Sequence, residues 1–186
     1  WAPASPSPID IAATTASLNF PSGVAVDRSG NLYIGDTFNH RVRKVSAATG
    51  IITTVAGTGS AGFTGDEVPA TSTRLNRPVG IAFEPSGTFV FSDSYNNRVR
   101  RVHTDGTITT VAGTGAVGYN GDNIQATSAT LYTPHSVAVD RRGDIYISDT
   151  TNNRVRRVRA TDGRITTYAG NGGQNGFNPD GPATVT

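Results

Sequence analysis

Hydrophobic residues in this chain gather in short runs, separated by polar stretches rich in glycine, serine, asparagine and aspartate. The runs are short and rich in residues that favour strands, and turn signals separate one run from the next. Turn dipeptides such as Asp105-Gly106 follow the runs and favour tight hairpins. The pattern therefore predicts four strands joined by three hairpins in one antiparallel sheet. The first four runs are Val24–Val26, Leu32–Gly35, Arg41–Val45 and Ile52–Ala56.

The same succession of runs occurs three times. The copies begin at Leu18, Leu75 and Leu131, which are 57 and 56 residues apart. A polar, glycine-rich loop follows the fourth run of each copy, as in residues 57–74. We therefore divide the chain into a Pro/Ser-rich N-terminal segment with half a loop (1–17) and three repeats (18–74, 75–130 and 131–186). The first eight residues are a candidate linker or site of O-glycosylation.

A four-stranded sheet repeated at a fixed period is typical of a β-propeller blade, so the predicted fold is all-β with three such blades. A stacked β-solenoid is the alternative, although its coils are usually shorter. Three blades do not close a ring, because propellers usually have four to eight. We expect either half of a six-bladed ring, closed by a second copy of the chain, or a segment of a longer array. A head-to-tail filament is a third possibility.

One motif extends through each repeat: Pro-x-Gly-Val-Ala-Val-Asp-x-x-Gly-x-Leu-Tyr-Ile-x-Asp-x-x-Asn-x-Arg-Val. The second copy has Glu84 in place of the first Asp, and the third has Ser136 in place of Gly. This motif resembles the NHL repeat, and the Val-Ala-Gly-Thr-Gly and Pro-Ala-Thr segments resemble its long variety of about 56 residues. The resemblance implies a β-propeller. It leaves the function open, since NHL propellers serve as protein-binding, RNA-binding and enzyme-associated modules.

Composition narrows the possible chemistry. The chain has 186 residues, a net charge of +2 and no cysteine, which excludes disulfides and thiolate metal sites. It contains no Met, not even at position 1, so we expect a processed product or a portion of a longer protein. No apolar run approaches the roughly 18–20 residues of a membrane-spanning helix. Localisation stays open, and an extracellular or cell-surface location is favoured.

Arginine dominates the charged residues, and most of the basic side chains lie on the third strand of each repeat. One interpretation is a positively charged ring that binds RNA or another polyanion, for which Arg43, Arg100 and Arg156 are the candidate binding residues. The favoured interpretation is structural, because an Asp recurs together with the Arg in every copy and the two types suit bidentate ion pairs. The predicted members of these ion pairs are Asp36, Arg41, Asp93, Arg98, Asp149 and Arg154.

Each loop between repeats carries one aromatic residue and one aspartate. The aromatic residues Phe63, Tyr119 and Phe177 are candidate binding residues, although we expect them mainly to fill the grooves between blades. The aspartates are expected to cap turns, because no loop has the three or more closely spaced carboxylates of a Ca²⁺ site.

The sequence offers little for catalysis, and no catalytic residue, metal site or cofactor is predicted. His135 stands at the start of an innermost strand, where propeller lyases that the repeats resemble hold a metal. The equivalent positions are Ser22 and Val79, whereas zinc catalysis normally needs three protein ligands. We therefore predict a non-enzymatic scaffold that binds proteins or assembles with itself, with glycans as further possible partners. The alternatives are an RNA-binding propeller and a fragment of a metal-dependent lyase.

Overall fold

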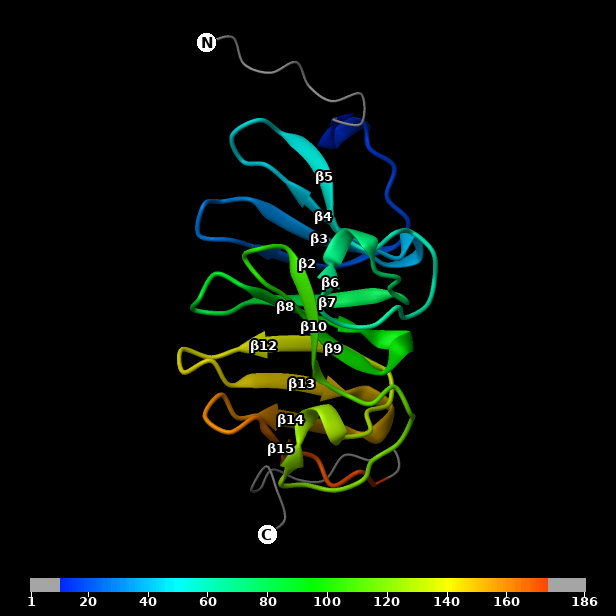
Figure 1. Cartoon of the computed structure of the whole chain (residues 1–186), viewed down its shortest axis with the longest axis vertical. Coiled ribbons are helices and arrows are strands. Elements are labelled where there is room, and N and C mark those ends of the chain that lie inside the picture. The colour runs from blue at the N-terminus through cyan, green and yellow to red at the C-terminus, as the bar shows by residue number, and fades with distance from the viewer. Residues whose placement is uncertain (1–10, 174–186) are drawn as a thin grey trace.

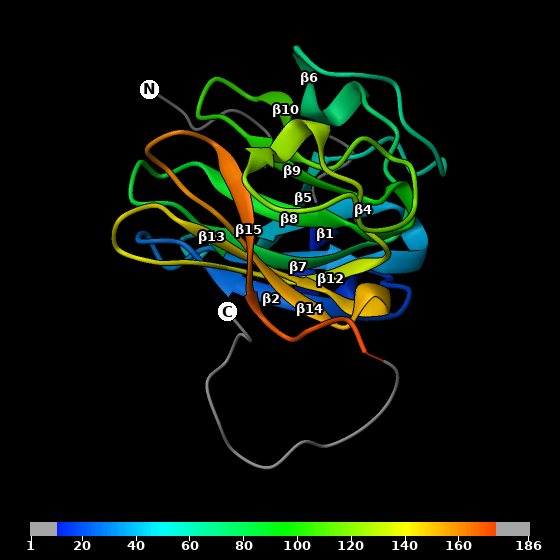
Figure 2. The same ribbon diagram turned by 90° about the horizontal axis from the view of Figure 1, so that it is seen from below.

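Three antiparallel sheets form the protein, stacked as successive layers with one sheet for each repeat (Figure 1). The computed structural model describes residues 11–173. The all-β propeller arc with three blades is confirmed. Figure 2, seen from below, shows the strands of the third sheet lying over those of the other two.

Blade 1 contains β1 (Ile11–Ala12), β2 (Pro21–Val26), β3 (Leu32–Asp36), β4 (Arg41–Val45) and β5 (Ile51–Ala56). Blade 2 contains β6 (Val68–Pro69), β7 (Pro78–Phe83), β8 (Phe89–Asp93), β9 (Arg98–Val102) and β10 (Thr107–Ala112). Blade 3 contains β11 (Ile124–Gln125), β12 (Pro134–Val139), β13 (Ile145–Asp149), β14 (Arg154–Val158) and β15 (Arg164–Ala169).

Each sheet has five strands, where the sequence predicts four. The strand order in blade 2 is β6-β10-β9-β8-β7, so the extra strand lies on the outer edge. It comes from the loop that precedes the blade: Val68 pairs with Ile108 and Pro69 with Thr107. A strand of two residues has no alternation that a sequence pattern could reveal. Each edge strand leads into a short 3₁₀ turn, η1 (Ala13–Thr15), η3 (Ala70–Ser72) or η5 (Ala126–Ser128).

A second kind of 3₁₀ turn joins the second and third long strands of each blade. These turns are η2 (Thr37–Asn39), η4 (Ser94–Asn96) and η6 (Thr150–Asn152). Each ends in a residue with left-handed backbone geometry, His40, Asn97 or Asn153, with φ near +50°. The turn places the Asp at the end of one strand opposite the first Arg of the next, for example Asp93 opposite Arg98.

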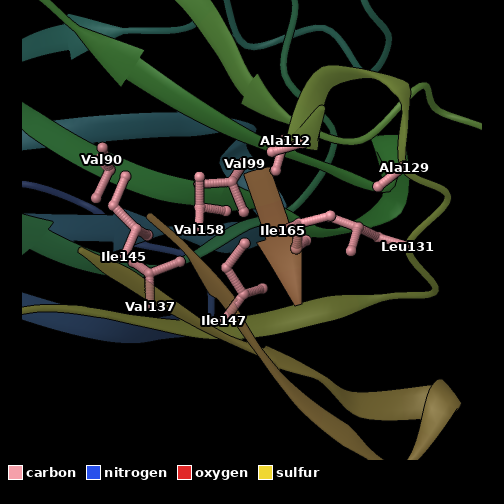
Figure 3. Packing of buried hydrophobic residues seen from close by; sticks show 11 residues of the cluster. Val90, Val99, Ala112, Ala129, Leu131, Val137, Ile145, Ile147, Val158 and Ile165 are labelled. Atoms are coloured by element: carbon pink, nitrogen blue, oxygen red, sulfur yellow. The ribbon is translucent and has the colours of Figure 1, made fainter. Parts of the chain in front are cut away.

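The hydrophobic core lies between the blades. Figure 3 shows the cluster between blades 2 and 3, where Val90 and Val99 from blade 2 meet Ile145, Ile147 and Val158 from blade 3. A second cluster fills the space between blades 1 and 2. Blade 2 is therefore covered on both faces, and every residue of β8 is buried.

Candidate functional site

A buried carboxylate ends the second long strand of every blade. In blade 2 both oxygens of Asp93 accept hydrogen bonds, from the backbone N–H of Asn76 (2.6 Å) and from Asn96 Nδ2 (2.8 Å). Asp93 is fully buried, and burial raises its pKa to about 6 against the opposing effect of these hydrogen bonds and of Arg100. Burial also raises the pKa of Asp149 in blade 3. The equivalent residue in blade 1 is Asp36, which is fully buried as well.

The ion pair of each blade forms at a different arginine from the one that we predicted. Asp93 lies opposite Arg98, but Arg98 extends past that carboxylate to the carbonyl oxygen of Thr114 (2.5 Å). Arg100, on the same strand face, approaches Asp93 instead, with Nη1 3.6 Å from Oδ2. Thus Arg43, Arg100 and Arg156 make the ion pairs with Asp36, Asp93 and Asp149, at 3.6–3.7 Å. Arg41 and Arg154, like Arg98, donate to loop carbonyls.

The side chain of Arg100 is fully buried between two carboxylates. On the side away from Asp93, its Nη2 donates to the carbonyl of Gly65 (2.8 Å) and to Asp66 (2.9 Å), both in the loop before the blade. The loop aspartate is thus an ion-pair partner, where we expected a turn cap. Arg156 of blade 3 is equally buried and makes the same contacts with Gly121, Asp122 and Asp149.

The loop aromatics Phe63 and Tyr119 lie over these arginines. The Phe63 ring centre is 3.8 Å from the Arg98 guanidinium carbon and 4.8 Å from that of Arg100. Tyr119 covers Arg154 and Arg156 at 3.9 and 4.8 Å. Such stacking stabilises a desolvated guanidinium. Both rings keep over a third of their surface exposed. Phe177 lies outside the described residues.

The path of this loop explains why the Val-Ala-Gly-Thr-Gly segment contains its first glycine. Gly113 has φ +96°, and a Cβ there would lie 2.2 Å from the carbonyl oxygen of Asn97. The segment can therefore pass the η4 corner only with glycine at this position. The loop is thereby held in a position where the carbonyl oxygen of Thr114 accepts the hydrogen bond from Arg98.

The histidines lie in separate places. His40 Nδ1 accepts the backbone N–H of Arg77 from the next blade (3.2 Å), and burial lowers the pKa of His40. His103 contacts Thr109, and His135 is exposed on β12. Over residues 11–173, no three His, Asp or Glu side chains come together in a way that could hold a metal ion.

Sequence reasoning missed the residues that join the blades. Thr37 Oγ1 of blade 1 donates to the carbonyl of Pro78 in blade 2 (2.8 Å). Ser94 Oγ of blade 2 donates in the same way to Pro134 of blade 3 (2.6 Å). A hydroxyl residue directly after the buried Asp in all three copies was the available signal. Thr150 is the equivalent hydroxyl residue of blade 3.

Side-chain acceptors at the corners of the blades make a second contact across each seam, the boundary between two adjacent blades. The N–H of Thr133 in blade 3 donates to Asn97 Oδ1 of blade 2 (3.0 Å), as that of Arg77 donates to His40. Asn153 occupies this position in blade 3. The two seams are therefore built from one set of polar contacts around an apolar interior.

Among residues 11–173, nothing covers one face of each outer blade. On blade 1, Phe20, Val24 and Val26 are 64%, 67% and 61% exposed. Ile81 and Val137, at the positions equivalent to Val24, are each only 7% exposed because a preceding blade covers them. On blade 3 the open face presents Thr150 and Asn153. The first repeat therefore has an apolar face suited to a blade that its described neighbours do not supply.

Comparison with known proteins identifies the repeats. The NHL repeat family matches residues 18–45 and 131–158. Teneurin-m of Drosophila melanogaster is 30% identical over 173 residues, which are 85% of this chain and 6% of that protein. Protein SUPPRESSOR OF QUENCHING 1, chloroplastic, of Arabidopsis thaliana is 33% identical over 85 residues, 46% of this chain and 8% of that one. NHL repeat-containing protein 2 of Bos taurus is 32% identical over 95 residues, 50% of this chain and 13% of that protein.

Solved structures share the fold at lower identity. A chain of the nidogen/laminin complex matches with a TM-score of 0.59 and 19% identity, over 82% of this chain and 49% of that one. Virginiamycin B lyase from Staphylococcus aureus matches with a TM-score of 0.53 and 19% identity, over 86% of this chain and 44% of that one. At such identities the likeness shows the fold alone. This chain spans less than half of each of these proteins. No helix in residues 11–173 is long and apolar enough to span a membrane.

Proposed function

Because the chain belongs to the NHL-repeat family, we propose that it is a non-enzymatic propeller unit that serves as a protein-binding and self-assembly scaffold. The observation that carries this proposal is the pair of open blade faces. The open face of blade 3 presents the side chains that donate and accept hydrogen bonds across a seam. The open face of blade 1 presents the backbone groups that would pair with them, together with apolar side chains.

The complementarity can be followed residue by residue. Thr150 and Asn153 of blade 3 correspond to Ser94 and Asn97, which hold the next blade through a backbone carbonyl and an N–H group. On blade 1 the corresponding groups are the carbonyl of Pro21 and the N–H of Phe20. In the described residues Thr150 Oγ1 reaches only the carbonyl of Ser148, at 3.3 Å. Two chains joined head to tail through both faces would close a six-bladed ring with twofold symmetry.

One residue departs from the seam pattern. The inner strands approach closely at glycines, and a Cβ on Gly23 would lie 2.1 Å from the carbonyl oxygen of Val79. A Cβ on Gly80 would lie 2.7 Å from Ser136 Cα. On the open face of blade 3 this position is Ser136 itself. In the proposed seam between blade 3 of one chain and blade 1 of another, the inner strands therefore lie slightly farther apart. This seam is weaker than the two seams within a chain, and Ser136→Gly should strengthen it.

The buried arginines argue against the polyanion alternative. Arg100 and Arg156 are inaccessible, and each already has two carboxylate partners. Phe63 and Tyr119 are retained as contact residues for a protein partner, since their outer surfaces are exposed. The nidogen/laminin complex, which contains a chain of this fold, is an assembly of proteins and agrees with such a role.

Sedimentation velocity at micromolar concentration tests the proposal. The 19.4 kDa chain should sediment at twice its mass or more. Val24→Asp should shift the protein toward the monomer by placing a charge on the open face of blade 1. Val117→Asp is the matched control, because Val117 is 59% exposed on the loop between β10 and β11 and lies on no strand of an open face. A cooperatively folded monomer, or equal behaviour of the two variants, would refute the assembly.

A further inference from the structure

A groove with an apolar floor and a basic rim lies at the seam between blades 2 and 3. It encloses about 520 Å³, within the usual range for small-ligand sites. Val111, Ile145 and Val158 form the floor, and the last two lie in the cluster of Figure 3. The rim carries four arginines and one glutamate: Arg101, Arg141, Arg142, Arg159 and Glu84.

Smaller side chains replace aromatic rings in the interior of this seam. Between blades 1 and 2 the corresponding space holds three aromatic rings, Tyr33, Phe83 and Phe89, with centres 4.9–5.8 Å apart. One repeat later the same positions are Val90, Val139 and Ile145. Of these three residues Ile145 lines the groove, so the groove has an isoleucine where the other seam has the ring of Phe89.

The rim has more positive charge than its own acids neutralise. Arg101 is paired with Glu84 (2.6 Å) and Arg159 with Asp162 (2.8 Å). Arg141 and Arg142 have no ion-pair partner among residues 11–173. The nearby Asp140 carboxylate accepts backbone N–H groups of its own hairpin, including that of Arg142 (2.8 Å).

One arginine of the rim also has a hydrogen-bond donor without a partner. Arg159 Nε is buried and has no hydrogen-bond partner in the described part of the chain. A buried donor without an acceptor costs free energy, and the Arg159 side chain that carries it lines the groove.

We propose that this groove binds a small organic carboxylate that carries an aromatic or branched apolar body. The carboxylate lies at the arginine rim, and the body lies against the apolar floor, where Ile145 stands in place of the Phe89 ring of the other seam. An inorganic anion would leave the apolar floor uncovered, and a neutral apolar molecule would leave the arginines unpaired. The site lies within one chain, so it does not depend on the assembly proposed above.

Titration of the ¹⁵N-labelled protein with 3-phenylpropionate tests the site, with 3-phenylpropanamide and inorganic phosphate as comparison ligands. We expect the acid to shift the backbone amide signals of Gly143, Ala160 and Gly163, which line the groove. The neutral amide and phosphate should each bind about tenfold more weakly, the effect of losing one charge-assisted contact or the apolar contact.

Two variants separate charge from volume. Arg141→Gln with Arg142→Gln should weaken binding of the acid about tenfold or more. Ile145→Phe restores a ring that Phe89 supplies at the other seam and should abolish binding, with folding checked by circular dichroism. Arg28→Gln is the control, because Arg28 holds the position of Arg141 in the hairpin of blade 1. Equal binding of acid and amide, unchanged binding by the double variant, or no shift at millimolar acid would each overturn the proposal.

Discussion

Replacement of Asp93 by alanine should strongly destabilise the protein. The change removes the acceptor of two buried hydrogen bonds, from Asn76 and Asn96, and one of the two carboxylates beside Arg100. Each lost hydrogen bond costs roughly 0.5–1.5 kcal/mol. A buried guanidinium deprived of a partner raises the total to about 3–5 kcal/mol. The remaining contacts of Arg100 with Asp66 and Gly65 place the expected loss near the lower end, about 3 kcal/mol.

Urea unfolding followed by far-ultraviolet circular dichroism measures this loss. Asp66→Ala is the matched comparison, because it removes the other carboxylate of the same arginine at a position whose side chain is 38% exposed. We expect it to cost no more than about 1 kcal/mol. Asp93→Asn should fall between wild type and Asp93→Ala, since an amide oxygen still accepts the N–H of Asn76. A loss below about 0.5 kcal/mol for Asp93→Ala, or a larger loss for Asp66→Ala, would refute this account of the buried ion pair.

The remaining predictions concern pH, backbone geometry and nucleic acid. The folded pKa of Asp93, about 6, exceeds its unfolded value of 3.8, so its stabilising contribution is complete below pH 3.8 and is lost as the pH rises through 6. The free energy of unfolding should therefore gain about 1 kcal/mol from this group between pH 7 and pH 5, and Asp93→Asn should flatten the profile. Gly113→Ala should destabilise the protein more than Gly121→Ala in thermal melts, because both have positive φ but only the Cβ at 113 would collide with backbone. RNA and duplex DNA should bind weakly, and sub-micromolar affinity at physiological salt with a log–log salt slope near −4 or steeper would contradict the burial of the arginines.

Local sequence determined the blade and its repetition. Short runs of strand-forming residues, the turn dipeptides between them and the spacing of 57 and 56 residues were enough to predict three antiparallel sheets of one design. These features depend on residues close in the chain, so a single sequence reveals them. The association of Asp with Arg was visible in the same way, because both recur in every copy.

Tertiary structure decided which of these residues meet. Strand pairing brings Asp93 opposite Arg98, but the glycine-rich loop draws Arg98 away and leaves Arg100 as the partner. The two-residue edge strands come from a loop whose polar composition gave no sign of pairing.

The seams depend on the structure even more completely. Whether a position such as Val24 is covered or exposed is set by the presence of a neighbouring blade, not by the residue itself, as its 67% exposure against 7% for Ile81 shows. The groove at the second seam likewise required the knowledge that Val111 of blade 2 and Ile145 and Val158 of blade 3 face one space. Contacts between repeats join residues roughly 40 positions apart, and no pattern within a single repeat specifies them.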